Sequence, residues 1–291
     1  MADPMRVLLA GRQDGIGCRL SCFIAAVLIA EEQTLQLRFL WPQTGVLNRN
    51  QIAGDVADIF PAVGHLVIAN EAEIIEPFKI VQRFSKWYLP ERIQDLRKTL
   101  QGLDLAICLQ KSLSRMQLYD YTIHARLGDA LQMPLFFGST KVFPRCGYLQ
   151  IIRTIATRSP RATIFLATDD PALTTQAKAI HPLVFSEEEL MSDLGLNDTR
   201  SIVKLWAVAS QLSKSRQLIC PPGSGFSMLS KIIRLHPFDE IEPAEFLGIA
   251  DIYQELNILW TQHAIRVLGA DSSESEINTR RMRQNLEREL P

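Results

Sequence analysis

The sequence predicts an α/β fold built from parallel sheets, and three observations support this prediction. Short, continuous apolar runs alternate with helical segments, first over residues 6–40 and again from residue 121 onward. These runs do not alternate between polar and apolar residues, as the strands of a sheet with one solvent-exposed face do. We therefore expect both faces of the sheet to be covered by other elements. Glycine-rich or polar loops follow several of the runs. Strand–loop–helix–strand units of this kind are typical of a parallel sheet.

The first half of the chain is expected to form an N-terminal α/β lobe over residues 1–115. Its expected elements are, in order, a strand at 6–10, a glycine turn at 11–17, a helix at 19–31, a strand at 35–40, a turn region at 57–65 and a helix at 90–100. Pro90 suits the first position of that last helix, where its missing N–H has no partner to lose. The remainder of residues 43–120 is less regular.

A second α/β series is expected to form a C-terminal lobe over residues 116–265. Its expected strands and helices are strands at 121–124, 163–167, 183–185 and 217–220, and helices at 147–157, 171–180, 199–212, 226–235 and 250–268. Asp170 before Pro171 is a typical helix start, with a side-chain N-cap followed by proline. Residues 266–291 are polar and charged, and we expect a solvated or disordered tail.

Composition excludes several classes of function. The net charge is −1, so no overall basic field attracts nucleic acid or an anionic membrane. The five cysteines are odd in number and form no CxxC pair, so we expect buried thiols rather than a zinc site or disulfides. The sequence shows no signal peptide and no apolar run of membrane-spanning length. We therefore expect a cytoplasmic protein without a transmembrane segment.

The strongest candidate for chemistry is the segment that contains His124, Arg126 and Asp129, which follows a predicted strand. Alternation along the strand places His124 and Arg126 on one face. The guanidinium of arginine is a rigid fork of donors that fits phosphate oxygens, and Asp129 is placed to orient it. A structural Arg–Asp pair with a half-buried histidine is the alternative from local composition.

A second candidate follows the next strand, at Thr168-Asp169-Asp170-Pro171. Asp170 is explained as an N-cap without any function. Asp169 is not needed for that cap, and a carboxylate at the end of a parallel strand suits ribose hydroxyls or a base. Asp169 is therefore the candidate ligand-binding residue here.

Two glycine loops open helices and complete the set of candidates. The loop 221–227 carries Ser224, Gly225, Phe226 and Ser227, and its backbone N–H groups and helix N-terminus suit a diphosphate, although a plain serine-capped loop explains it equally well. The second loop contains Gly15 and Gly17 between a strand and a helix. It lacks the third glycine and the acidic residue of a dinucleotide fold, so we expect these glycines to let a ligand approach the backbone.

Together these segments resemble the fucosyltransferase superfamily, which includes core α1,6-fucosyltransferases, bacterial nodulation fucosyltransferases and protein O-fucosyltransferases. The segment Gly15-Ile-Gly17-Cys-Arg19-Leu resembles the first glycine loop of that group, and His124-Ala-Arg126-Leu-Gly-Asp129 resembles its His-x-Arg-Arg-x-Asp motif. Residues 164–171 and 207–227 are similar to two later segments. The motifs cover about a third of the chain and span most of its length.

The resemblance implies the GT-B fold, in which two Rossmann-like lobes face a cleft. It implies an inverting transfer from GDP-fucose to a glycan or saccharide acceptor, with no metal or other cofactor required. By position, Arg126 would bind the β-phosphate, His124 would help to read guanine, and Asp169 would lie in the nucleotide pocket. Ser224 and Phe226 would line the donor site.

Four positions depart from the motifs of that superfamily and keep alternatives open. Leu127 replaces the second arginine of the central motif, Cys18 follows Gly17, Pro134 stands where a catalytic glutamate is expected, and Lys204 stands where an aspartate would meet guanine. The general base is therefore unassigned, with Asp129 the nearest acid and the 186–193 acidic stretch a second source. A transferase for another nucleotide sugar and a non-catalytic binding relative stay open. We expect the acceptor to bind mainly the first half, and the 250–268 helix to be available for homo-oligomer formation.

Overall fold

The computed structural model describes residues 5–12, 15–41, 53–74, 78–86, 89–127, 143–234 and 239–253. The chain divides into two compact units. The first comprises Met1–Gln117, Leu190–Lys214 and Gly225–His236, and the second comprises Leu118–Glu189, Ser215–Ser224 and Pro237–Pro291. Within the described residues each unit contains a sheet of parallel strands, which confirms the predicted α/β class. The predicted donor and acceptor roles of the two halves stay predictions.

The sheet of the first unit has the order β3-β2-β1-β4. Its strands are β1 (Met5–Gly11), β2 (Gln36–Leu40), β3 (Val67–Ile68) and β4 (Phe78–Phe84). β1 pairs with β2 in a register that sets Leu9 opposite Arg38. The sequence did not predict β4, because its residues alternate between half-buried and exposed positions and include charged side chains rather than one apolar run.

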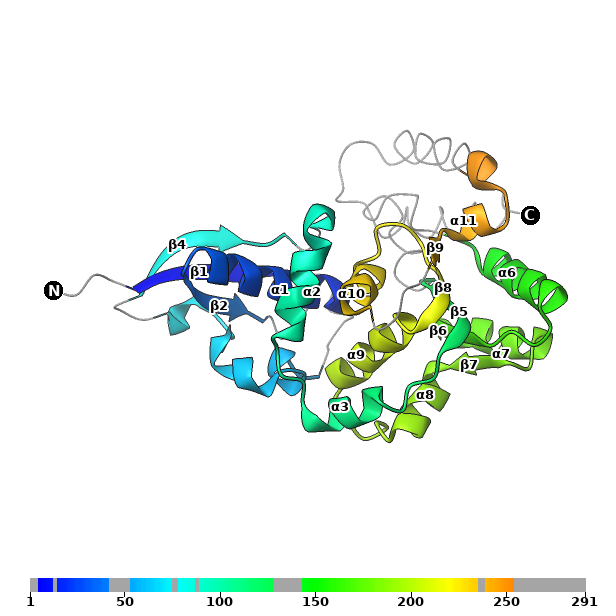
Figure 1. Cartoon of the computed structure of the whole chain (residues 1–291), viewed down its shortest axis with the longest axis horizontal. Coiled ribbons are helices and arrows are strands. Elements are labelled where there is room, and N and C mark those ends of the chain that lie inside the picture. The colour runs from blue at the N-terminus through cyan, green and yellow to red at the C-terminus, as the bar shows by residue number, and fades with distance from the viewer. Residues whose placement is uncertain are drawn as a thin grey trace, which may run out of the picture. The chain divides into compact units, whose positions relative to one another are not determined.

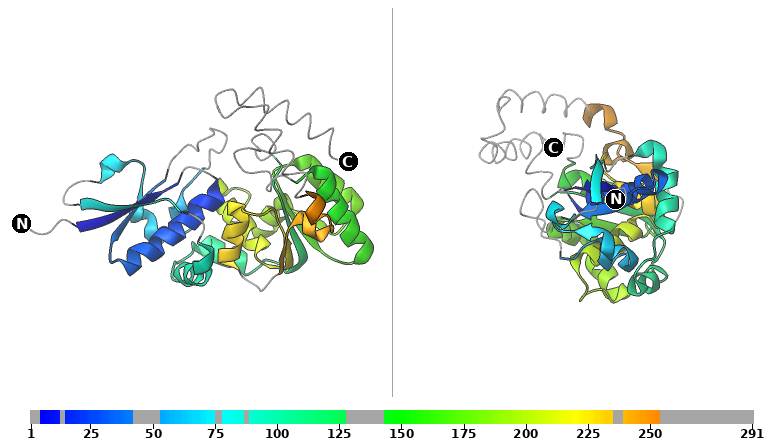
Figure 2. Two further views of the ribbon diagram at one scale, coloured as in Figure 1. Left: turned by 90° about the horizontal axis from the view of Figure 1, so that it is seen from above. Right: turned by 90° about the vertical axis from the view of Figure 1, so that its left-hand side faces the viewer.

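Helix α1 (Ile16–Glu32) lies along β1 and β2 and forms the centre of the first unit (Figures 1 and 2). It is apolar on nearly every side because it also packs against α2 (Ile93–Gln101) and α10 (Gly225–Ile233). Phe23 of this helix is fully buried and meets the ring of Phe39 edge-on, with ring centroids 5.2 Å apart. The continuous apolar run that predicted this helix therefore reflects burial on more than one face.

Shorter elements complete the described part of the first unit. They are 3-10 helices at Val56–Asp58, Pro61–Leu66, Glu71–Glu73 and Pro90–Arg92, together with α3 (Ile107–Leu113) and α9 (Ser201–Leu212). Trp206 of α9 packs edge-on against Phe60, with ring centroids 5.1 Å apart. The helix α3 was not predicted, since its seven residues are too few to show a helical period.

The sheet of the second unit has the order β7-β6-β5-β8-β9, with β5 in the centre. Its strands are β5 (Tyr119–Ala125), β6 (Ile164–Thr168), β7 (Val184–Ser186), β8 (Ser215–Ile219) and β9 (Asp239–Ile241). The helices of this part of the chain are α6 (Arg145–Arg158), α7 (Pro171–Ile180), α8 (Glu187–Leu194), which spans the boundary between the units, and α11 (Pro243–Phe246). α6 and α7 pack against each other beside the sheet (Figure 1), and their apolar residues join those of β5 and β6 in one core.

The start of helix α7 lies where the sequence predicted it. Helix α7 begins at Pro171, and the Asp170 carboxylate accepts a hydrogen bond of 3.0 Å from the Ala172 N–H, which confirms the predicted N-cap. Of the predicted 250–268 helix, residues 250–253 are helical and the rest lies outside the described residues, as does the predicted tail. The strand β9 was not predicted, since only three residues form it.

The expectation of buried cysteine thiols is only partly correct. All five cysteines are thiols, but only Cys22 and Cys220 are buried. Cys18 is partly exposed, and Cys108 and Cys146 are exposed on α3 and on the first turn of α6. Amphipathic helices bring some small residues to the surface, and cysteine content alone does not show which.

Both sheets reverse their strand order at the first strand. In the first sheet β2 lies on one side of β1 and β4 on the other, and in the second sheet β6 and β8 flank β5 in the same way. Open α/β sheets bind ligands outside the carboxyl ends of the strands at such a reversal. The loops that follow β1 and β5 are therefore the places where the fold itself favours a site.

Candidate functional site

The carboxyl end of β5 carries His124 and Arg126. His124 is the penultimate residue of β5 and is only 8% exposed, and Arg126 directly follows the strand and is half-buried. Burial, reinforced by the charge of Arg126, lowers the pKa of His124 to about 3. The imidazole is therefore neutral at physiological pH, and it can donate and accept hydrogen bonds without adding a second positive charge beside Arg126.

Asp169 follows the neighbouring strand β6 and is linked to the same loop. Its Oδ1 accepts a hydrogen bond of 2.8 Å from the backbone N–H of Leu127, while its side chain stays exposed. Asp170, the next residue, caps α7 and pairs with Arg145 at 2.6 Å. The structure thus separates the two aspartates as the sequence predicted: Asp170 holds a helix, and Asp169 faces the edge where Arg126 lies.

Glu187 is a third acidic group at this edge, directly after β7. Burial raises the pKa of Glu187 to about 7; the backbone of Thr168 partly opposes this rise, and the charge of Asp169 adds to it. The sequence indicated only an acidic stretch at 186–193, so the placement of Glu187 among its neighbours comes from the structure.

Tyr148 on α6 adds a buried hydroxyl that no sequence pattern singled out. Its side chain is fully buried, and its hydroxyl proton has no acceptor among the described residues. Burial and the nearby Tyr253, Cys220 and Asp169 raise the pKa of Tyr148 well above its usual value, and the backbone of Arg126 only partly opposes this rise, so the hydroxyl keeps its proton. A buried donor without an acceptor is costly and marks a candidate ligand contact.

The loop after β8 lies on the other side of the strand-order reversal from β6. It includes Cys220, which is buried and places its Sγ 3.6 Å from a Glu240 carboxylate oxygen. Ser224 closes the loop with 3% exposure, and its hydroxyl has no hydrogen-bond partner within the described ranges. The loops after β5 and β8 therefore flank the reversal and carry Arg126 and Ser224, which were predicted independently.

The other glycine and serine candidates meet in the first unit, where the N-termini of α1 and α10 touch. A Cβ added at Gly17 would come within 2.5 Å of the Gly225 backbone, and a Cβ added at Gly225 would clash with the Cys18 sulfur. Gly17 and Gly225 therefore let the two helices approach closely. Gly15 stands at the N-cap of α1, where an added Cβ would meet no described atom within 4 Å and no side chain caps the helix N–H groups.

Both helix N-termini of this pair lack acidic residues in their first turns. Because α1 and α10 meet at Gly17 and Gly225, the backbone N–H groups and the positive ends of both helices lie close together. Such an arrangement suits an anion. Phe226 and Ser227 stand in the first turn of α10, half-buried and buried respectively. The helix pair thus collects Gly15, Gly17, Gly225, Phe226 and Ser227 within one unit, and their predicted ligand roles stay predictions.

Three positions that raised questions in the sequence have different outcomes. Asp129 and Pro134 lie outside the described residues, so the predicted pairing of Asp129 with Arg126 stays a prediction. Lys204 on α9 donates a hydrogen bond from its Nζ to the backbone oxygen of Asn197. Its ammonium group is thus used, at least in part, to hold the turn before α9.

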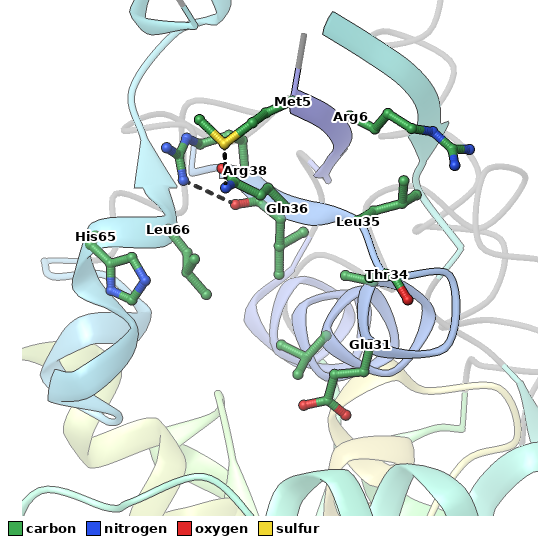
Figure 3. A pocket seen from close by; sticks show the side chains of 12 residues that line it. Met5, Arg6, Glu31, Thr34, Leu35, Gln36, Arg38, His65 and Leu66 are labelled. Carbon is green, nitrogen blue, oxygen red and sulfur yellow. Dashed lines mark hydrogen bonds between the residues drawn. The ribbon is translucent and has the colours of Figure 1, made fainter. Parts of the chain in front are cut away.

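The structure also contains a cavity of about 810 Å³ in the first unit (Figure 3). It lies at the start of β1 and β2 and the end of α1, between Gln36, Glu31 and His65. None of the predicted site residues lines it. Because ligands of open α/β sheets bind at the carboxyl ends of the strands, the strand-end residues are the better candidate site despite this cavity.

The described residues contain no group of three or more histidine, cysteine, aspartate or glutamate side chains arranged to hold a metal ion. Within the same ranges, no helix has the length and apolar character needed to cross a bilayer.

The comparison with known proteins gives a structural likeness but no sequence match. No protein-family model matches the sequence, and no curated protein matches it. Fucosyltransferase NodZ from Bradyrhizobium superposes with a TM-score of 0.50 at 13% identity, over 79% of this chain and 93% of that chain. A structure of POFUT1 in complex with GDP superposes with a TM-score of 0.48 at 10% identity, over 83% of this chain and 99% of that chain.

The NodZ α1,6-fucosyltransferase soaked with GDP-fucose gives a TM-score of 0.45 at 13% identity, over 79% of this chain and 92% of that chain. At 13% identity, the likeness to fucosyltransferase NodZ from Bradyrhizobium shows the fold alone. The chain therefore has a GT-B, fucosyltransferase-like fold, as the resemblance of its motifs implied.

Proposed function

We propose that this protein is a glycosyltransferase that transfers fucose from GDP-fucose to a saccharide or glycan acceptor. The observation that carries the proposal is the position of Arg126. It follows the central strand β5, at the reversal of strand order, in a fold shared with fucosyltransferase NodZ. The neutral His124 and the exposed Asp169 beside it supply hydrogen-bonding groups for the rest of the nucleotide.

In this proposal the reaction is an inverting single displacement. Breakage of the sugar–phosphate bond builds negative charge on the leaving diphosphate, and the guanidinium of Arg126 stabilises that charge. The proposal requires no metal ion, because fixed donors of this kind can perform the same electrostatic role.

For the acceptor we propose only the unit that binds it, and for the general base only a first candidate. We place the acceptor with the first unit, since the strand-end groups of the second unit are given to the donor. Asp129 is the acid nearest to Arg126 in the sequence and is the first residue to test as the base.

The test is calorimetry with GDP on the full chain and on Arg126→Ala. Loss of a charge-assisted, two-point phosphate contact is expected to weaken GDP binding by about a hundredfold or more. Arg153→Ala is the matched control, because Arg153 is an exposed arginine on α6 of the same unit. Equal GDP affinity in the wild type and Arg126→Ala would refute this site.

A nucleotide panel separates the donor alternatives. Lys204 stands where a carboxylate would meet guanine and is bound to Asn197, so guanine preference has to be measured. Thermal stabilisation by GDP but not by UDP or ADP is expected, and a shift with UDP alone would favour another nucleotide sugar. Measurement of GDP released from GDP-fucose distinguishes a catalytically active transferase from a protein that only binds the donor.

A further inference from the structure

Arg145, in the first turn of α6, has a guanidinium group with unused hydrogen-bonding capacity. Its Nε donates to the Oδ2 of Asp170 at 2.6 Å, and the other carboxylate oxygen, Oδ1, accepts the Ala172 N–H at 3.0 Å. Neither Nη group of Arg145 makes a hydrogen bond or ion pair with a described residue. The side chain is 47% exposed, so these two groups are accessible to a ligand.

Two hydrogen bonds place Arg145 at the same edge of the sheet as Arg126. The N–H of Leu127, the residue after Arg126, donates to the Oδ1 of Asp169 at 2.8 Å. Asp170, the next residue along the chain, binds Arg145. The consecutive aspartates after β6 therefore contact the loop after β5 on one side and the start of α6 on the other. Both arginines lie at the carboxyl ends of the strands, where open α/β sheets bind ligands.

The position of Arg145 is unfavourable for helix α6 itself. The first turn of α6 contains no acidic residue, and the N-cap residue Pro144 offers no side-chain cap. The N-terminus of a helix carries a partial positive charge, so a cation there is disfavoured and an anion is attracted. The ion pair with Asp170 offsets part of this cost, although Asp170 already serves as the N-cap of α7. Local rules are broken in this way mainly at functional sites.

A second observation on the same helix indicates a ligand. Tyr148 lies three residues after Arg145, so the two are neighbours on the helix surface. The Tyr148 side chain is fully buried, and its hydroxyl has no hydrogen-bond partner among the described residues. Its ring packs edge-on against Phe143, with ring centroids 5.2 Å apart. Because buried polar groups normally have partners, a bound molecule at the start of α6 would complete this group.

We propose that Arg145 is a second diphosphate-binding residue of the donor site, which acts beside Arg126. This inference rests on the proposed function. A diphosphate carries more than one negative charge, whereas Arg126 supplies a single positive charge. The two Nη groups of Arg145 form a fork for phosphate oxygens while its Nε stays on Asp170. The positive end of α6 adds to this attraction.

The experiment is calorimetry of the full chain and of Arg145→Gln with guanosine, GMP and GDP. Glutamine removes the charge and the fork, so GDP binding is expected to weaken about tenfold or more, while guanosine keeps its wild-type affinity. An equal loss for GMP and GDP assigns Arg145 to the first phosphate, and a loss confined to GDP assigns it to the second. Arg153→Gln is the matched control, since Arg153 is an exposed arginine of the same helix and should leave all three affinities unchanged.

Three results would overturn the inference. No loss of GDP affinity in Arg145→Gln would remove Arg145 from the donor site. An equal loss for guanosine, GMP and GDP, with a lower free energy of unfolding in urea, would show that Arg145 only stabilises the start of α6. Full GDP affinity in Arg145→Lys, which keeps the charge without the fork, would contradict the two-point contact, since only partial recovery is expected.

The proposed function fails in a different way. If the wild type binds no nucleoside diphosphate, the proposed function and this inference are refuted together. If the wild type binds GDP and Arg126→Ala weakens that binding while Arg145→Gln does not, the proposed function stands and this inference alone is refuted.

Discussion

The two sheets have the same winding but different chemistry at their carboxyl ends. In each, later strands are added on one side of the first strand before the chain crosses to the other. β5, β6 and β7 are followed by Arg126, Asp169 and Glu187, whereas β1 is followed by Arg12, whose guanidinium donates to the Ser85 backbone oxygen at 2.7 Å, and β2 by the buried Trp41. Further along from β1, Gly17 provides close helix packing.

The comparison shows that two sheets with the same strand order can carry different kinds of residues at their carboxyl ends. The first unit supplies tight helix packing and uncapped helix N-termini, and the second supplies His124 and Glu187, whose pKa values burial shifts at the strand ends. Perturbed groups concentrate at functional sites because burial and neighbouring charges are tolerated there for chemistry. Substitutions at the contact of α1 with α10 should therefore act mainly on stability, whereas those at the β5–β7 edge should act on ligand binding and, where burial shifts a pKa, on the pH dependence of stability.

The largest effect is expected from Gly17→Ala in the first unit. The new Cβ would meet the Gly225 backbone at 2.5 Å, so α1 and α10 must separate. We expect a loss of about 3–4 kcal/mol in the free energy of unfolding, at or above the upper end of the usual cost of overpacking, because the contact is with backbone atoms that cannot rotate away. Gly15→Ala is the control: its site is open and its φ is −56°, so a loss below about 1 kcal/mol is expected. Urea unfolding measures both, and equal losses would contradict the packing account.

The next effect is the pH dependence of stability due to Glu187. The pKa of the Glu187 carboxyl group rises from 4.5 to about 7 on folding, so the native state binds more protons than the unfolded state between these pH values. The wild type therefore loses stability as the pH rises from 4.5 through 7, and below pH 4.5 this group causes no loss. We expect Glu187→Gln to be about 2–3 kcal/mol more stable relative to wild type at pH 8 than at pH 4.5. Urea unfolding at several pH values measures this difference, and parallel curves for the two proteins would show that Glu187 is not buried beside Asp169.

The smallest effect separates the two adjacent aspartates. Asp170→Ala removes the α7 cap and the Arg145 ion pair, and we expect a loss of about 1–2 kcal/mol in unfolding free energy. Asp169→Asn keeps an acceptor for the Leu127 N–H, so stability should change by less than about 0.5 kcal/mol while GDP affinity falls. Chemical unfolding and calorimetry on the same samples test the pair. Reversed roles, with Asp169 stabilising and Asp170 binding, would contradict the assignment.

Several features could be predicted from the sequence because local interactions determine them. Helix α7 begins at Pro171 because Asp170 caps the adjacent N–H groups and proline fits the first turn. The strands β1 and β6 contain short apolar runs between turn signals, which indicate buried strands. The difference between Asp169 and Asp170 followed from the same cap rule. Strand β4 was missed because an edge strand needs no apolar run, and its pairing with β1 is a contact between distant segments.

The sequence by itself determined the fold class, the positions of most strands and helices, and the residue types at the strand ends, since these depend on interactions over a few residues. The tertiary structure decided which of those ends are neighbours. It placed Gly17 against Gly225 and Asp169 between Leu127 and Glu187, and it buried the Tyr148 hydroxyl near Asp169. Pairing of distant strands and helices sets burial and charge proximity, and these in turn set the pKa values that distinguish Glu187 from the glutamates beside it.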